Sequence, residues 1–228
     1  VTFSATGGNT FLWNNSSVND SITVGTSGDY FCSVYKSDGC FKNTDTLNVL
    51  IKTSPSTPQI CAVTVDSLST HNIIFWDKTS VTGASAFNIY REDVTNVYSY
   101  IGTVVYDSLS EFHDYGANPN VTTKRYKITA IDTCGQESPM SNYHNTIYIV
   151  SNGSGQFSWN PIYTIENTAN PVNNYLLMRD DLSNGNWTQV ASTAGTQFIV
   201  NDPAYSSYPN GRWRVETAWN ISCLATRG

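Results

Sequence analysis

The sequence predicts an all-β chain of tandem β-sandwiches, and three observations support this prediction. Aromatic residues make up 13% of the 228 residues and charged residues only 13%, a composition that suits strands joined by polar turns better than helices. No run of apolar residues recurs at the three- and four-residue spacing of an amphipathic helix. Short alternating segments are instead separated by turn signals such as Asp38-Gly39 and Asn184-Gly185.

The first 52 residues are expected to form one partial sandwich of short strands. The alternation and the turn residues place strands at 1–5, 10–13, 21–24, 28–35 and 46–51. Residues 53–58 follow as a linker, because two prolines within a Ser/Thr run resist both a helix and a central strand. The length of the whole chain leaves room for one or two further modules of ordinary size.

Residues 59–148 and 149–228 are predicted to be two copies of one sandwich, the second without its last strand. Five segments match in the same order: 76–77 with 159–160, 87–91 with 175–179, 100–104 with 187–191, 112–114 with 200–202, and 126–130 with 213–217. Five ordered matches indicate an internal repeat, and its length is that of a whole sandwich.

Alternation within the last matched segment predicts which side chains are buried. Tyr126, Ile128 and Ala130 should face the core, and Arg125, Lys127 and Thr129 should face water. In the second copy the inward positions are Trp213, Val215 and Thr217. Trp13, Trp76 and Trp159 are also expected in the cores.

These residues resemble a known family. The middle copy, with a Trp at 76, Tyr126-Lys127-Ile128-Thr129-Ala130 and the segment 137–142, is similar to a fibronectin type III domain. Its segments 58–66, 88–92 and 131–138 resemble modules of proteins that Gram-negative bacteria export by type IX secretion. Residues 1–52, with Gly28-Asp29-Tyr30 and Gly39-Cys40, resemble immunoglobulin-like or PKD-like modules. The expected order is therefore one immunoglobulin-like module followed by two fibronectin-III-like modules.

The resemblance implies a piece of a large secreted or cell-surface protein on the extracellular face of a Gram-negative bacterium. Modules of this kind act as spacers or stalks, as adhesive segments that bind a surface glycan or a cell-envelope protein, or as accessory regions of an exported hydrolase. The secretion machinery is a further implied partner. Four Asp-Ser/Thr-apolar triplets match a bacterial O-glycosylation signal and make Ser21, Thr46, Ser67 and Ser108 candidate sites.

Charge and hydropathy exclude other partners. A net charge of -6 and a pI of about 4.9 disfavour nucleic acid, because an acidic surface repels phosphates. No apolar stretch is long enough for membrane insertion.

The five cysteines lack zinc spacing and indicate disulfides of an exported protein. One pairing joins Cys32 to Cys40 and Cys61 to Cys134 and leaves Cys223 over. Five cysteines permit other connectivities, so the pairing is not fixed.

The sequence offers no chemistry of its own. None of the three histidines stands with a nucleophile elbow, and Leu182 breaks the one acidic loop that hints at calcium. We therefore expect no enzyme, no cofactor and no metal site. Trp187 and Trp219 are the aromatic residues less clearly buried, and they are the candidates for contact with a ligand.

Overall fold

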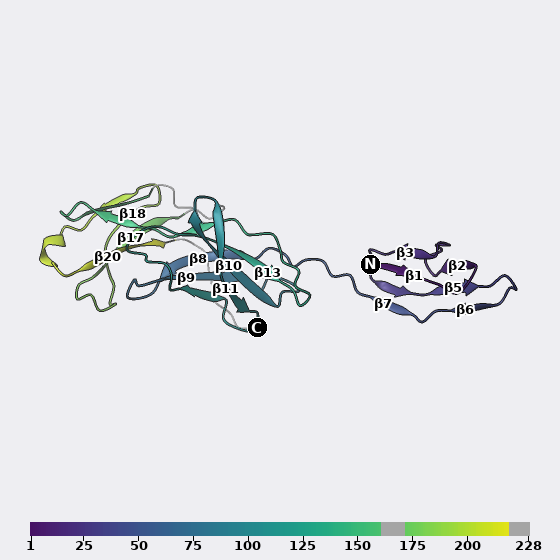
Figure 1. Ribbon diagram of the computed structural model, residues 1–228. Coiled ribbons are helices and arrows are strands. Elements are labelled where there is room, and N and C mark those ends of the chain that lie inside the picture. Colours follow the sequence, from purple (N-terminus) through teal and green to yellow (C-terminus); the bar gives the residue numbers. More distant parts are fainter. Residues whose placement is uncertain (161–171, 219–228) are drawn as a thin grey trace. The chain divides into compact units, whose positions relative to one another are not determined.

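The structure is a computed structural model that describes residues 1–160 and 172–218 (Figure 1). The chain separates into two units, Val1–Thr53 and Ser54–Gly228. The division falls at the start of the proline-containing stretch that the sequence marks as a linker.

The first unit consists of short antiparallel strands around a small core. β1 pairs with β3, and β4 pairs with β7. The remaining three strands form a sheet in the order β2-β5-β6. The buried core includes Trp13, Ile22, Tyr30, Cys32 and Val49. The strands are β1 (Thr2–Ser4), β2 (Thr10–Trp13), β3 (Ser21–Thr23), β4 (Gly28–Tyr30), β5 (Cys32–Tyr35), β6 (Phe41–Asn43) and β7 (Leu47–Val49).

The strand expected over residues 28–35 is divided at Phe31. β4 belongs to the sheet with β7, whereas β5 pairs with β2 and β6. Asn14 holds the break: its backbone N–H donates to the carbonyl of Phe31 at 3.1 Å, and its side-chain oxygen accepts the N–H of Phe31 at 3.3 Å. The side chain of Asn14 thus accepts the hydrogen bond that a neighbouring strand would otherwise accept from Phe31, and the chain crosses here from one sheet to the other.

The second module is a two-sheet antiparallel sandwich. One sheet has the order β12-β9-β8 and the other β11-β10-β13-β14. Trp76, Phe87, Ile89, Tyr126 and Ile128 fill the space between the sheets and are fully buried. The strands are β8 (Gln59–Val65), β9 (Asn72–Asp77), β10 (Ala86–Val94), β11 (Val97–Val105), β12 (Glu111–Asp114), β13 (Arg125–Ile131) and β14 (His144–Asn145).

The third module repeats this arrangement within the same unit. Its sheets are β15-β16-β19 and β18-β17-β20, which correspond to β8-β9-β12 and β11-β10-β13 of the second module. Phe157, Trp159, Tyr175, Leu177 and Val200 form its buried core. The elements are β15 (Ile149–Ser151), β16 (Gln156–Trp159), β17 (Asn174–Asp180), β18 (Thr188–Ala194), β19 (Ile199–Asn201), the short 3₁₀ helix η1 (Tyr205–Ser207) and β20 (Arg212–Ala218). The expected absence of a last strand concerns positions after 218, outside the described residues.

The predicted alternation is confirmed on the inward side of β13 and has one exception on its outward side. Tyr126, Ile128 and Ala130 are fully buried, as expected. Thr129 is only 2% exposed although it was assigned to water. Its hydroxyl donates to the carboxylate of Glu137, and the loop that carries Glu137 covers it. The tertiary position of a loop overrides the alternation at this residue.

Candidate functional site

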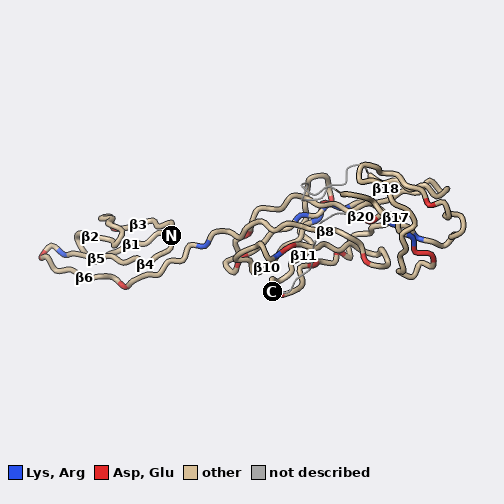
Figure 2. Tube along the Cα trace, turned by 180° about the vertical axis from the view of Figure 1, so that it is seen from behind, with Lys and Arg blue, Asp and Glu red and all other residues tan. Residues whose placement is uncertain are grey.

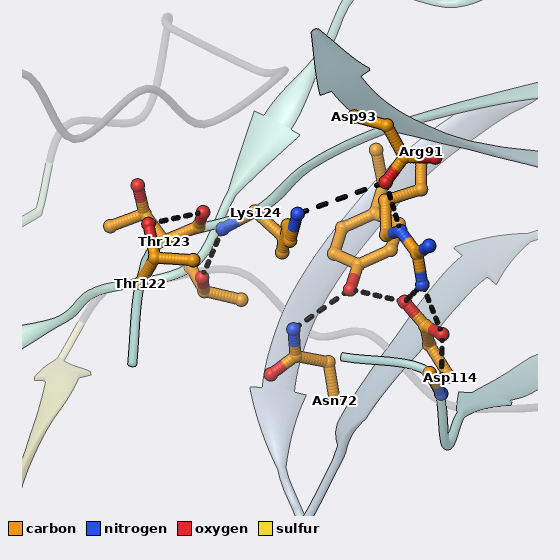
Figure 3. A network of polar contacts seen from close by, with 10 residues as sticks. Asn72, Arg91, Asp93, Asp114, Thr122, Thr123 and Lys124 are labelled. Carbon is orange, nitrogen blue, oxygen red and sulfur yellow. Dashed lines mark hydrogen bonds and ion pairs between the residues drawn. The ribbon is translucent and has the colours of Figure 1, made fainter. Parts of the chain in front are cut away.

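A buried arginine–aspartate pair occupies the same position in both copies of the repeat. Arg91 on β10 donates from Nη1 to both carboxylate oxygens of Asp114 at the end of β12, at 2.9 and 3.1 Å (Figure 3). In the third module Arg179 on β17 donates from Nη1 to Asp202 at 2.8 Å. Because β10 and β12 belong to opposite sheets, the pair joins the two layers of the sandwich. We call each pair, with the side chains that bond to it, the inter-sheet clamp.

A third side chain completes each clamp. It is an aromatic hydrogen-bond donor on the strand next to that of the arginine, which is β13 beside β10 and β20 beside β17. The hydroxyl of Tyr126 donates to Asp114 at 2.8 Å and accepts a hydrogen bond from Asn72 at 2.7 Å. The indole N–H of Trp213 donates to Asp202 at 2.9 Å in the third module. Burial raises the pKa of the Tyr126 hydroxyl, so this group stays protonated as a donor.

The carboxylates in the clamps are saturated with donors. Desolvation favours the neutral form of Asp202, but hydrogen bonds from Trp213 and Arg179 outweigh it and lower the pKa of this carboxyl. Backbone N–H groups of Gly116 and Ala204 complete the shells of Asp114 and Asp202 at 3.0 and 2.9 Å. A carboxylate held this way stabilises the sandwich, and the lowered pKa of Asp202 leaves this group little capacity to accept a proton from a substrate.

A second polar cluster joins the second and third modules. The indole N–H of Trp187 donates to the carbonyl of Ser67 at 2.7 Å, and Nη1 of Arg212 donates to the carbonyl of Leu68 at 2.7 Å. The guanidinium of Arg214 lies 4.2 Å from the centre of the Trp187 ring. We call these contacts the inter-module contact. Both acceptors lie in the turn between β8 and β9.

Both sides of the inter-module contact are held in place by an aspartate. Arg212 is fixed by an ion pair of 2.6 Å with Asp180, which is fully buried. Desolvation acts to raise the pKa of Asp180, but the hydrogen bonds from Arg212 and from two backbone N–H groups lower it to about 2. On the other side, Asp66 accepts the backbone N–H groups of Leu68, Thr70 and His71 and thereby shapes the turn.

Trp187, a candidate for contact with a ligand, therefore takes part in a contact within the protein. Its ring is half-buried and its polar atom is already bonded to Ser67. Trp219, the second expected ligand contact, lies outside the described residues.

The predicted disulfide pairs do not form. Cys32, Cys40 and Cys134 are free thiols, so neither Cys32–Cys40 nor Cys61–Cys134 is a disulfide. Cys32 points into the core of the first unit and is fully buried, whereas Cys40 is exposed at the far end of the β5–β6 hairpin. Cys223 lies beyond the part of the chain that the structure describes.

The candidate glycosylation residues lie at turns or strand ends. Thr46, Ser67 and Ser108 are exposed, and Ser21 is half-buried at the start of β3. Modification at these residues stays a prediction.

The histidines occupy two different environments. His144 on β14 is 1% exposed, and burial lowers its pKa to about 4 against a weaker opposite effect of its hydrogen bond to the backbone of Ile60. His71 and His113 lie together near the surface, with 2.8 Å between ring nitrogens. Within residues 1–160 and 172–218 no group of three His, Cys, Asp or Glu side chains could hold a metal ion.

One aromatic surface escaped the sequence analysis. Tyr35 and Phe41 stack across the β5–β6 hairpin with 5.3 Å between ring centres, and Phe41 is 62% exposed. Phe41 borders an open depression of about 710 Å³ that is also lined by Lys36 and Lys42. The Asp38-Gly39 turn was recognised in the sequence, but the strand after it was not, and the pairing of these rings follows from that strand.

A narrower groove of about 280 Å³ lies within the second unit between β8 and β20. Its volume is at the lower limit of typical small-molecule sites. Basic and acidic residues are interspersed along the chain trace without a long stretch of one sign (Figure 2). In the described part of the chain no helix has the length and apolar character to span a membrane.

Neither a protein-family model nor a curated protein matches this chain. Among solved structures, it is similar to the β-1,2-glucanase of Parabacteroides distasonis, with 17% identity and a TM-score of 0.36 over 49% of this chain. This match spans only 16% of the glucanase. The FN1–FN3 domains of chicken CNTN1 match 92% of this chain and 75% of their own length, with 12% identity and a TM-score of 0.34.

The central fibronectin-III array of RIM-binding protein matches 75% of this chain and 70% of its own length, with 11% identity and a TM-score of 0.31. The sheets described above establish a chain of tandem β-sandwiches, and fibronectin type III arrays are among the solved structures that it resembles.

Proposed function

We propose that this chain is a non-catalytic spacer, or stalk, in a large secreted or cell-surface protein of a Gram-negative bacterium. The observation that carries the proposal is the inter-module contact, in which Trp187 and Arg212 bind the turn at Ser67 and Leu68. The location outside the cell and export by type IX secretion are supported by the sequence resemblance of the middle module.

A spacer must keep neighbouring modules in a fixed relative orientation, and the inter-module contact is suited to this task. Both hydrogen bonds end on backbone carbonyls of a turn that Asp66 holds rigid. The donor side is equally fixed, because Asp180 holds Arg212. Groups fixed before they meet lose little conformational freedom on contact, so a small interface can still restrict the movement of two modules.

Residual dipolar couplings measured by NMR test this proposal. Amides of the second and third modules should fit one common alignment tensor in the wild-type chain. The Trp187→Ala/Arg212→Ala double variant should require two tensors, with both modules still folded. Leu182→Ala is the matched control, because Leu182 is 78% exposed in the same β17–β18 connection. Two independent tensors in the wild-type chain would refute the spacer proposal.

The second candidate function is binding of a surface glycan or of a cell-envelope protein. The exposed ring of Phe41, stacked on Tyr35 beside the depression, favours it, since a flat exposed ring is a platform for a sugar face. Retention of the chain on a panel of polysaccharides, lost in Phe41→Ala and kept in Leu47→Ala, would support binding. Leu47 is a suitable control because it is an exposed apolar residue of the same unit.

A third candidate is an accessory region of an exported hydrolase, as the sequence resemblance implies. Sequencing the gene on both sides of this region tests it: an adjoining hydrolase domain would support the accessory role.

A further inference from the structure

Two histidines of the second module face each other on the outer side of the sheet β12-β9-β8. His71 immediately precedes β9, and His113 on β12 is paired with Ile73. The alternate positions of β9, beginning with Asn72, are buried, so His71 and Ile73 point away from the core. Nε2 of His71 lies 2.8 Å from Nδ1 of His113.

The far side of each imidazole faces oxygen atoms. Oγ1 of Thr70 lies 3.0 Å and a carboxylate oxygen of Asp66 lies 3.5 Å from Nδ1 of His71. A carboxylate oxygen of Glu111 lies 3.8 Å from Nε2 of His113. A carboxylate beside one ring nitrogen favours the proton there and leaves a lone pair on the other nitrogen. This arrangement therefore favours two lone pairs that point at each other.

Two facing lone pairs repel each other unless a proton or a metal ion lies between them. In a hydrogen-bonded pair of two neutral rings, one of the facing nitrogens carries the proton, and the far nitrogen of that ring then has none. A metal ion accepts both lone pairs and lets both rings keep their far-side N–H groups. We propose that His71 and His113 form a two-histidine site for a divalent ion of the late first transition series, such as Zn²⁺, Ni²⁺ or Cu²⁺. This inference is independent of the spacer function.

The distance between the rings is close to what such an ion requires. Bonds of about 2.0 Å at a tetrahedral angle separate two ligand nitrogens by about 3.3 Å. The ring centres lie 5.1 Å apart, so the two rings now face each other head-on. To bind an ion at that angle, the nitrogens must part by about half an ångström from the observed 2.8 Å, and each ring must turn off the line that joins the two nitrogens. The side chain of His113 is 36% exposed and has room for this movement. The ring of Tyr115 packs 4.4 Å from that of His71 and covers one side of the pair.

The site supplies two protein ligands, since the described residues contain no third His, Cys, Asp or Glu in reach of the ion. Water fills the remaining positions. Imidazole ligands bind Cu²⁺ more tightly than Ni²⁺ or Zn²⁺, so affinity should follow that order.

A titration of the tag-free chain with ZnCl₂, followed by NMR of the histidine rings, tests the site. The chain has three histidines, so each ring signal can be assigned by substitution. We expect the ring signals of His71 and His113 to shift together and those of the buried His144 to stay in place. His71→Gln and His113→Gln should each weaken Zn²⁺ binding at least tenfold.

Two further outcomes decide the matter. The same titration with NiCl₂ should broaden the His71 and His113 ring signals at concentrations that leave His144 sharp. Zn²⁺ binding that persists in the His71→Gln/His113→Gln double variant, or ring signals of His71 and His113 that ignore Zn²⁺, would overturn the proposal. A folded amide spectrum of His113→Gln shows that any loss of binding is a loss of a ligand.

Discussion

Acid should destabilise the second module through His144, which is buried between β13 and β8. Its folded-state pKa is about 4, lowered by desolvation, against an ordinary value of about 6.5 in the unfolded chain. Between these values the unfolded chain binds a proton that the folded module rejects. Stability is therefore complete above about pH 7 and falls as the pH decreases through 6.5 toward 4.

The difference between the two pKa values sets the size of the effect. Proton linkage gives a loss of about 2 kcal/mol at pH 5 and about 3 kcal/mol near pH 4, relative to pH 7. No discount for solvent is needed, because the side chain is 1% exposed. His144→Gln removes the titrating group, so this part of the pH dependence should disappear even if the variant is less stable throughout.

Native-state hydrogen exchange measures the effect module by module. The slowest amides of β10 and β13 report the free energy of opening of the second module, and those of β17 report the third. The free energy of opening measured in β10 and β13 should fall between pH 7 and pH 5 with a slope that depends on His144. The slope measured in β17 should not depend on His144. An equal slope in the wild-type chain and in His144→Gln would refute the argument. Repeating the comparison in His71→Gln separates the contribution of the surface histidines.

Three further predictions concern the clamp, the packing and the thiols. Asp114→Asn should destabilise the second module by about 2 to 3 kcal/mol, because it removes a buried acceptor of charged hydrogen bonds. Asp93→Asn, at the more exposed carboxylate beside Arg91, should cost less than about 1 kcal/mol. Urea unfolding or hydrogen exchange of the β10 amides measures both effects. Gly102→Ala should cost about 1 to 3 kcal/mol by urea unfolding, since the added Cβ would lie 2.5 Å from the ring of Phe112, while Gly25→Ala, with no atom within 4 Å, should change little. A thiol reagent should modify two of the three free cysteines in the folded chain and the third, buried one only after unfolding, in the order Cys40 and Cys134 before Cys32.

The sandwich class and the repeat could be predicted because they depend on local patterns. Alternation predicted the buried face of β13, and the ordered matches predicted that β17 and β20 would reproduce β10 and β13. The matches even contained the two clamps, since Arg91 matches Arg179 and Asp114 matches Asp202. Identical charged residues at equal positions of two copies were the available signal for a buried pair.

Other features depend on contacts that no local pattern contains. The break at Phe31 requires Asn14, which is distant in sequence and bonds to it through both main chain and side chain. The proposed cysteine pairs failed because nearness in sequence or in the strand order does not bring two sulfur atoms together. Trp187 was a candidate for contact with a ligand, and its indole N–H bonds to a turn 120 residues away in the same chain.

The two clamps differ in size, and this difference affects how the tandem chain can fold. Trp76 and Trp159 align the copies so that Asn72, the partner of Tyr126, corresponds to Gly155, where an added Cβ would lie 2.7 Å from the carbonyl oxygen of Asp202. Neighbouring similar modules are prone to exchange strands while they fold. If β9 replaced β16 in the third module, Asn72 would take the place of Gly155 and its side chain would not fit. If β16 replaced β9 in the second module, Gly155 would take the place of Asn72 and the Tyr126 hydroxyl would lose its hydrogen-bond donor. We therefore expect each copy to disfavour the other's strands, which would suppress strand exchange between the two modules while the chain folds.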